Sequence, residues 1–212
     1  MKKIMFSDAF CLTQEVLNGT KTMTRRVLKV PKTCNGKEVY SFNVLTNNAG
    51  TQCVDLIDEN GGVLGSWKPH YEVGEVVAIA QSYKEVYPNA DFEMVGNGFM
   101  TESAGWNNKM FVKASLMKRH IRITDVKVEH LQNISDKECL REGVKRASIG
   151  FYAEGVKVKD CEKEAHRETA SGCLKLFPFP RQAFASLIDK ISGKGTWESN
   201  PWVVAYSFEL VD

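Results

Sequence analysis

Apolar and polar side chains alternate along Ile121 to Val128 and again along Val203 to Leu210, which is the pattern of half-exposed β-strands. Val76 to Ala80 is a nearly continuous apolar run, which fits a buried strand. Lys2 to Phe6 and Lys21 to Leu28 also have strand-like composition. Several strands with turn signals between them predict an α+β fold dominated by a barrel-like sheet.

Two or three helices are expected beside this sheet. Asp8 can cap a helix that runs to Leu17, and Ser135 and Glu138 form a capping box at the start of a short helix. Arg181 to Ser192 has apolar residues at helical spacing. Each segment is followed by a glycine that can end a helix, namely Gly19, Gly143 and Gly193.

The chain of 212 residues predicts a single domain over 1–212 that carries two insertions. Residues 31–70 contain Asn and Gly turn signals, among them Asn47-Asn48 and Gly50, between short β-like runs, and read as a hairpin-rich insertion. Residues 145–177 form the second, partly charged insertion. Pro88 to Asn108 is loop-like, with three glycines among polar residues.

Composition narrows the classes of function. The net charge of +2 permits contact with nucleic acid but lies far below that of a dedicated duplex-binding domain. No apolar run approaches the roughly 18–20 residues that cross a bilayer, and Asp8 interrupts any signal-peptide core, so a cytoplasmic protein with no membrane partner is expected. Six cysteines occur without a Cys-x-x-Cys pair, which favours free thiols.

Metal and cofactor binding are not expected. Cys161, His166 and Cys173 follow one another with four and six residues between them, and this spacing lacks the close pairs that zinc chelation usually needs. We therefore predict neither a metal site nor a cofactor. Asp125 and Glu129 are interpreted as charges on the surface of a strand.

The segment from Gly19 to Arg26 reads Gly-Thr-Lys-Thr-Met-Thr-Arg-Arg. A helix, this segment and a later strand introduced by Val73-Gly74-Glu75-Val76 resemble the ASCH-domain pattern. The C-terminal half is similar to ASCH-like proteins of phages and mobile elements in Arg122 to Val126, Leu131 to Ser135 with Glu142-Gly143, Trp197, and Asn200 to Val203. The resemblance covers most of the chain outside the two insertions.

The resemblance implies a PUA-like β-barrel with a pocket for RNA, a nucleotide or a modified nucleoside. Lys21, Arg25 and Arg26 are the residues expected to hold phosphate or another anionic ligand, and Thr22 is counted among the ligand-binding residues. Trp197 offers an aromatic face on which a base could stack. The leading hypothesis is a binding module of this kind, and the sequence does not indicate its oligomeric state.

One branch of the family resembles an amidohydrolase that removes the acyl group from acetylated cytidine. Its catalytic residues correspond to Lys21, Thr24 and Glu142. Because residues three apart on a strand face opposite sides, Lys21 and Thr24 can converge only if the chain bends near Thr20 to Thr22. We then expect Thr24 as nucleophile, Glu142 as base and protonated Lys21 as oxyanion stabiliser. A third hypothesis is a mobile-element accessory protein that binds a protein partner through its insertions.

Overall fold

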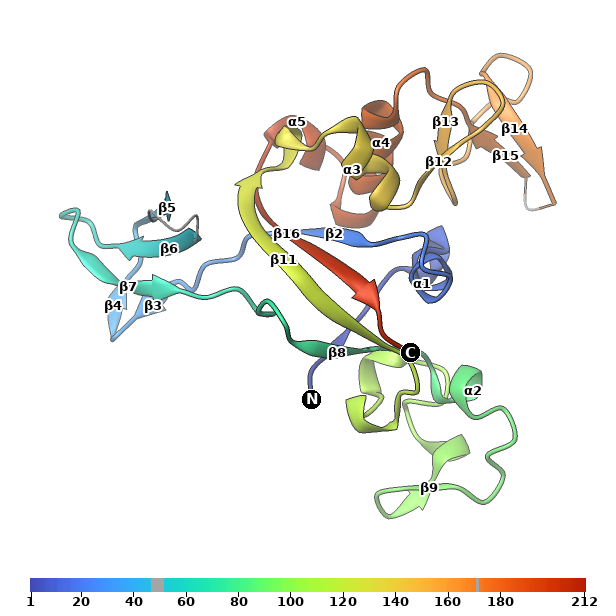
Figure 1. The fold of residues 1–212 in the computed structure, drawn as a ribbon, viewed down its shortest axis with the longest axis horizontal. Coiled ribbons are helices and arrows are strands. Elements are labelled where there is room, and N and C mark those ends of the chain that lie inside the picture. Colours follow the sequence, from blue (N-terminus) through green and yellow to red (C-terminus); the bar gives the residue numbers. More distant parts are fainter. Residues whose placement is uncertain (47–51, 171) are drawn as a thin grey trace.

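The computed structural model describes residues 1–46, 52–170 and 172–212, and its centre is a five-stranded mixed sheet (Figure 1). The first two strands in spatial order are parallel, and all other neighbours are antiparallel. Across the sheet the order is β1 (Lys3–Ile4), β8 (Val76–Ile79), β11 (His120–His130), β16 (Trp202–Leu210) and β2 (Met23–Val27). The α+β prediction is confirmed at this level.

The two longest strands, β11 and β16, pair from Ile121 opposite Leu210 to His130 opposite Trp202, with one irregularity before Asp125. Ile121 is fully buried, whereas the next residue, Arg122, is exposed. This burial confirms the alternation expected for β11. It arises because successive side chains of a strand point to opposite faces. β16 is more deeply buried than its alternating sequence suggests.

The sheet is strongly curved, but hydrogen bonds do not close it into a barrel within the part of the chain that the structure describes. Its edge strands are β1 and β2. The Arg26 side chain reaches across from β2 and donates a hydrogen bond from Nη2 to the carbonyl oxygen of Met5, 2.7 Å away. A side chain therefore connects the edges where a barrel would have a backbone ladder.

Five α-helices occur in the described ranges. They are α1 (Leu12–Leu17), α2 (Tyr83–Val86), α3 (Asp136–Arg141), α4 (Pro180–Ser192) and α5 (Thr196–Ser199). The helix expected from Asp8 is instead divided into a 3-10 turn, η1 (Asp8–Phe10), and α1. The break lies at Cys11, whose φ of 55° is left-handed and cannot continue a right-handed helix. The capping box of Ser135 and Glu138 at α3 is confirmed.

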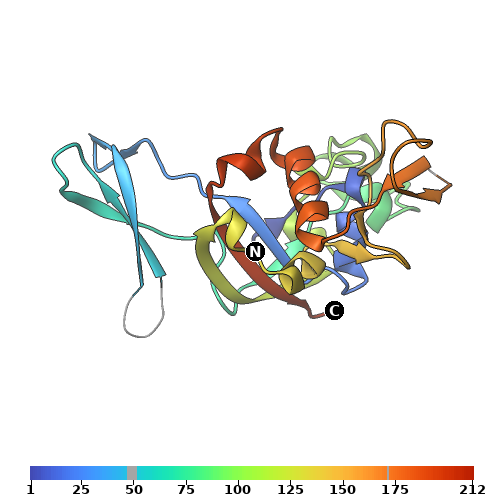
Figure 2. The same cartoon turned by 90° about the horizontal axis from the view of Figure 1, so that it is seen from above.

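Helix α4 lies over one end of the curved sheet, beside α3 and α5 (Figures 1 and 2). Ala183, Phe184 and Ile188 pack with Val203 of β16, because they recur on one face of the helix. Pro180 occupies the first turn, where its missing N–H costs no helical hydrogen bond. The predicted amphipathic helix is thus confirmed to within one residue.

The first predicted insertion forms two small sheets that extend away from the central sheet (Figure 2). They comprise β3 (Thr33–Cys34), β4 (Lys37–Glu38), β5 (Ser41–Thr46), β6 (Gln52–Ile57) and β7 (Val63–Trp67). The side chain of Gln52 exchanges two hydrogen bonds with the backbone of Val128, and Trp67 packs against the main core. The turn predicted at Asn47-Asn48 and Gly50 lies outside the described residues.

The second predicted insertion consists largely of two hairpins beside α4. Their strands are β12 (Val144–Arg146) with β13 (Phe151–Ala153), and β14 (His166–Thr169) with β15 (Gly172–Lys175). Both predicted insertions therefore have local hairpin structure.

The segment between β8 and β11 combines irregular structure with a short hairpin, β9 (Met94–Val95) and β10 (Gly98–Phe99), and three 3-10 turns, η2 (Met100–Glu102), η3 (Lys109–Phe111) and η4 (Ala114–Leu116). It also has a small core of its own, which includes Tyr83, Ala90 and Met100. None of the helices in the described ranges combines the length and apolarity that a bilayer span requires.

Candidate functional site

The bend that brings Lys21 toward β2 starts at the end of α1. Gly19 has a φ of 71°, which favours glycine, and the backbone N–H groups of Thr20 and Lys21 both donate to the carbonyl oxygen of Glu15. The Thr20 hydroxyl donates to the same carbonyl and to the Glu15 carboxylate. Lys21 therefore leaves a tight turn two residues before β2 begins, and does not follow the alternation of that strand.

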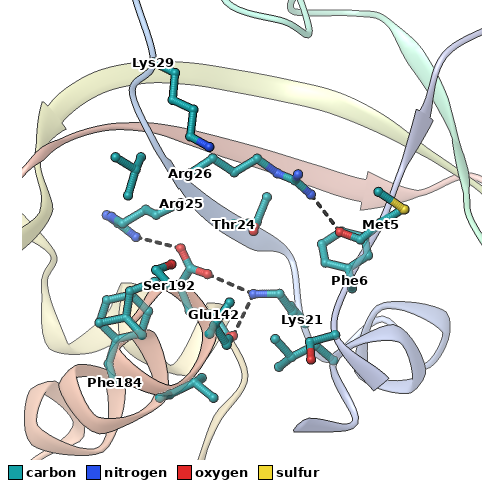
Figure 3. A pocket seen from close by; sticks show the side chains of 16 residues that line it. Met5, Phe6, Lys21, Thr24, Arg25, Arg26, Lys29, Glu142, Phe184 and Ser192 are labelled. Carbon is teal, nitrogen blue, oxygen red and sulfur yellow. Dashed lines mark hydrogen bonds and ion pairs between the residues drawn. The ribbon is translucent and has the colours of Figure 1, made fainter. Parts of the chain in front are cut away.

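The Lys21 ammonium is buried, with 2% of the residue exposed, and all three of its N–H donors are used. Nζ donates to the carbonyl oxygen of Met23 at 2.7 Å, to the carbonyl oxygen of Glu142 at 2.7 Å and to Oε2 of Glu142 at 2.8 Å (Figure 3). Glu142 caps the C-terminus of α3, so its carboxylate and its carbonyl both face Lys21. An ion pair with this much hydrogen bonding is one of the few ways to bury two charges.

Arg25 lies beside this pair and binds three carboxylates. Its guanidinium contacts Glu129 at 2.7 Å, Glu138 at 3.2 Å and Oε1 of Glu142 at 3.2 Å. Glu138 is also the capping-box residue of α3, so the same carboxylate starts the helix and binds the arginine. Glu129 is consequently a half-buried partner of Arg25, and the expectation of a strand-surface charge was wrong for this residue.

Burial shifts the pKa of Lys21 below its ordinary value, and the nearby charges of Arg26 and Arg25 act in the same direction. The carboxylate of Glu142 opposes this shift without cancelling it. For Arg25, burial disfavours the charged form, but the carboxylates of Glu142, Glu129 and Glu138 outweigh it and raise the pKa. Arg25 is therefore a permanent cation within a group of acids.

A cavity of about 670 Å³ borders this network. One wall is apolar and comes mainly from α4 and the N-terminal segment. Its apolar lining residues are Met5, Phe6, Leu12, Val27, Phe184, Leu187, Ile188 and Ile191. The opposite wall is β2, an edge strand of the central sheet, and it contributes Thr24, Arg25 and Arg26, followed by Lys29 (Figure 3).

Lys21, Thr24, Arg26 and Glu142 line this single cavity, so the structure brings together the residues that the sequence placed in one site. The Thr24 hydroxyl forms no hydrogen bond with any residue that the structure describes. The Nε atom of Arg26 is buried and also lacks a hydrogen-bond partner among the described residues. Lys29 is exposed at the rim and was not singled out from the sequence.

Three other predicted ligand-binding residues have different surroundings. The Thr22 hydroxyl accepts a hydrogen bond from Nε of Arg141 at 3.1 Å, and Thr22 does not line the cavity. Trp197 packs edge-on against Phe184, with the ring centroids 6.1 Å apart, and it too is absent from the lining. Arg25 lines the cavity, but its guanidinium is engaged by the three carboxylates.

The apolar wall could not be predicted from the sequence, because the apolar side chains of α4 have the spacing of ordinary core residues. The capping box of Ser135 and Glu138 was a usable signal for Glu138, because it places this residue in the helix whose C-terminus Glu142 caps. No group of three or more His, Cys, Asp or Glu side chains within residues 1–46, 52–170 and 172–212 is arranged to hold a metal ion. Comparisons with models of protein families, with curated proteins and with solved structures give no match.

Proposed function

We propose that the chain is a binding module that holds a nucleotide or modified nucleoside, free or within RNA, in the cavity beside β2. The observation that favours this function is the division of the cavity into an apolar wall and a cationic rim. A base has apolar faces with polar edges, and a phosphate needs cations. The ASCH resemblance of the sequence is consistent with this proposal, and so is a curved mixed sheet as an open variant of a PUA-like barrel.

The charges around the cavity are separated by sign. Lys21 and Arg25 are surrounded by Glu129, Glu138 and Glu142, so this inner group carries a formal charge of −1. Arg26 and Lys29 form no ion pair within the described residues. An anionic group of the ligand is therefore expected at Arg26 and Lys29, and is disfavoured next to the inner acids.

The apolar wall is expected to contact the base. Phe184 and Leu187 line the cavity from α4, whereas Thr24 and Arg26 line it from the polar strand β2. Such a combination of many apolar contacts and a few fixed polar groups is typical of small-molecule sites. The unpaired Thr24 hydroxyl lies between the two regions and can donate or accept a hydrogen bond at the edge of a base.

Calorimetric titration with cytidine, cytidine monophosphate and a short single-stranded RNA tests this function. Lys29→Ala is the most informative variant, because the residue is exposed and its loss should not affect folding. Losing one charged hydrogen bond of about 1.5–3 kcal/mol should weaken nucleotide binding roughly tenfold or more. Arg26→Ala should have a similar effect, and Arg122→Ala, an exposed arginine on β11, is the matched control.

The salt dependence provides a second measurement. The affinity for RNA should fall as salt rises, since phosphate contacts release counterions. The proposal is refuted if no nucleoside, nucleotide or RNA binds, or if Lys29→Ala and Arg122→Ala reduce the affinity equally.

Acyl-group hydrolysis is a second candidate, because the free Thr24 hydroxyl shares the cavity with the Lys21–Glu142 pair. In this reaction the Thr24 oxygen would attack the acyl carbon while its proton passes to Glu142. Glu142 would return that proton to the departing amine, and water would then hydrolyse the acyl-threonine ester, releasing the acid and restoring the Thr24 hydroxyl. Lys21 would support the oxyanion only after giving up one of its three hydrogen bonds. This requirement is the reason why we place binding first.

Chromatographic detection of cytidine released from N4-acetylcytidine separates the two candidates. A hydrolase should lose turnover with Thr24→Ala and retain part of it with Thr24→Ser, which keeps a hydroxyl. Binding of acetylcytidine without release by the wild-type protein would leave recognition as the function of the cavity.

A further inference from the structure

A second cavity, of about 400 Å³, lies at the two hairpins β12–β13 and β14–β15. It shares no lining residue with the cavity beside β2. Arg146 is the last residue of β12, and His166 and Arg167 begin β14. The remaining lining residues are Ala147, Ser148 and Leu176. Half of the lining is thus basic, and none of it is acidic.

Each of these two exposed arginines lies over an aromatic ring of β13. The Arg146 guanidinium carbon lies 5.9 Å from the centroid of the Phe151 ring, and that of Arg167 lies 4.9 Å from the centroid of the Tyr152 ring. Arg167 also donates a hydrogen bond from Nη1 to the Tyr152 hydroxyl. Contact with a ring face fixes a guanidinium while leaving most of its in-plane N–H donors available.

Neither arginine is neutralised by an acid. Within the described ranges, no carboxylate lies within ion-pair distance of Arg146 or Arg167, whereas Arg25 contacts three carboxylates. Among the described residues, the one carboxylate within 4.0 Å of a basic lining group is that of Glu168, whose Oε1 is 3.9 Å from Nε2 of His166 and whose side chain is 87% exposed. The two guanidiniums therefore give this cavity an uncompensated positive charge.

His166 has a defined orientation. Its Nδ1 lies 2.9 Å from the carbonyl oxygen of Glu164, and a carbonyl can only accept, so Nδ1 carries a proton. Nε2 is then the ring nitrogen left for other partners. Of Cys161, His166 and Cys173, only His166 lines this cavity, and the two guanidiniums beside it disfavour a divalent cation there. The same surroundings favour an anion.

We propose that this cavity binds a phosphate group. Two planar guanidiniums with free N–H donors match the several oxygens of phosphate, and Ser148 adds a hydroxyl donor at the turn. The phosphate can belong to a small phosphorylated ligand or to the backbone of single-stranded RNA. Because the two cavities share no lining residue, this site does not depend on the function proposed for the cavity beside β2.

The experiment uses the full chain, with inorganic phosphate and a fluorescein-labelled uridine decamer as probes. In the wild-type protein, the side-chain Nε–Hε resonances of Arg146 and Arg167 should shift when phosphate is added, a readout that requires no variant to fold. The double variant Arg146→Gln/Arg167→Gln should weaken binding of the responding probe about tenfold or more. Arg122→Gln, which replaces an exposed arginine on β11 outside both cavities, is the matched control.

The two probes distinguish the source of the phosphate. If phosphate shifts the two arginine resonances and the decamer binds no more tightly than phosphate does, the ligand is a small phosphorylated molecule. Decamer binding at concentrations at least about a hundredfold lower, with a salt dependence that decreases in the double variant, assigns an RNA backbone. The proposal is overturned if neither probe moves the two arginine resonances, or if the double variant binds the probes as the wild type does.

Discussion

Lys21 and Glu142 form a buried ion pair. Removing one partner should lower the free energy of unfolding by more than the intact pair contributes to it. The side chains are 2% and 5% exposed, and Nζ and Oε2 lie 2.8 Å apart. At this separation, attraction amounts to about 6 kcal/mol at an effective dielectric constant of about 20. Desolvation of the two ions, at several kcal/mol each, offsets most of it. Removing one ion leaves the other ion buried and desolvated, with no attraction to offset its desolvation free energy.

Lys21→Met and Glu142→Gln should therefore each lower the free energy of unfolding by about 3 kcal/mol, the lower end of the range for broken buried pairs. The lower end applies because Arg25 still contacts Glu142 in the first variant, and two carbonyl oxygens still accept from Lys21 in the second. The double variant should cost less than the sum of the two, by about 1–3 kcal/mol, because neither ion is then left alone.

Urea unfolding followed by circular dichroism measures these differences. With a slope near 2 kcal/mol per molar urea, each single variant should lower the midpoint by about 1.5 M. The matched control is Lys2→Met, which breaks a pair with Glu75 at 3.0 Å whose side chains are 44% and 24% exposed. Solvent screening should limit that cost to about 1 kcal/mol or less. Equal costs for Lys21→Met and Lys2→Met, or strictly additive single variants, would refute this account.

Four further results are expected. Burial raises the pKa of the Cys139 thiol from 9.0 to about 12, so between these two pH values the folded chain keeps a proton that the unfolded chain loses. The free energy of unfolding should therefore decline above pH 9. Cys139→Ala should lessen this decline in urea titrations at alkaline pH. A thiol reagent should modify Cys139 only after unfolding, but react at once with the exposed Cys11, Cys53 and Cys161; rapid labelling of Cys139 would contradict its burial. Gly105→Ala should lower the melting temperature measurably, since a Cβ there would lie 2.5 Å from the Tyr83 ring, and an unchanged melting temperature would show that the ring can move away. Ser135→Ala should cost about 0.5–2 kcal/mol in urea unfolding by removing the capping box with Glu138, and a smaller loss would mean that packing alone holds α3.

The parts of the fold that the sequence predicted are those set by local patterns. Alternation placed β11, and the apolar spacing and the glycine that follows placed α4 to within one residue. The capping box placed the start of α3 for the same reason, since its two hydrogen bonds join residues three apart. Local patterns did not place the break at Cys11, because the neighbours of η1 are distant in sequence: Phe10 packs against the main core, and Gly155 closely approaches the carbonyl oxygen of Ala9.

The candidate site shows the same division between local and long-range information. Lys21 and Thr24 could be placed together because a glycine turn separates the helix from the strand. The partners of Arg25 come from β11, α3 and the residue after α3, more than 100 positions later in the chain. No spacing rule connects such distant residues, and so the sequence presented Arg25 as a free cation for a ligand.

Arg25 and Arg26 are neighbours in sequence, yet the strand separates them chemically. Successive side chains of β2 point to opposite faces, so Arg25 turns to the acids of β11 and α3, and Arg26 turns toward the N-terminal segment. Arg25 thus holds Glu142 beside Lys21 through an ion pair, whereas the charge of Arg26 is available to a ligand in the cavity. A shift of β2 by one residue would turn the Arg25 side chain to the other face of the strand, away from its three carboxylates. The register of this edge strand therefore determines both the buried charge network and the cationic rim.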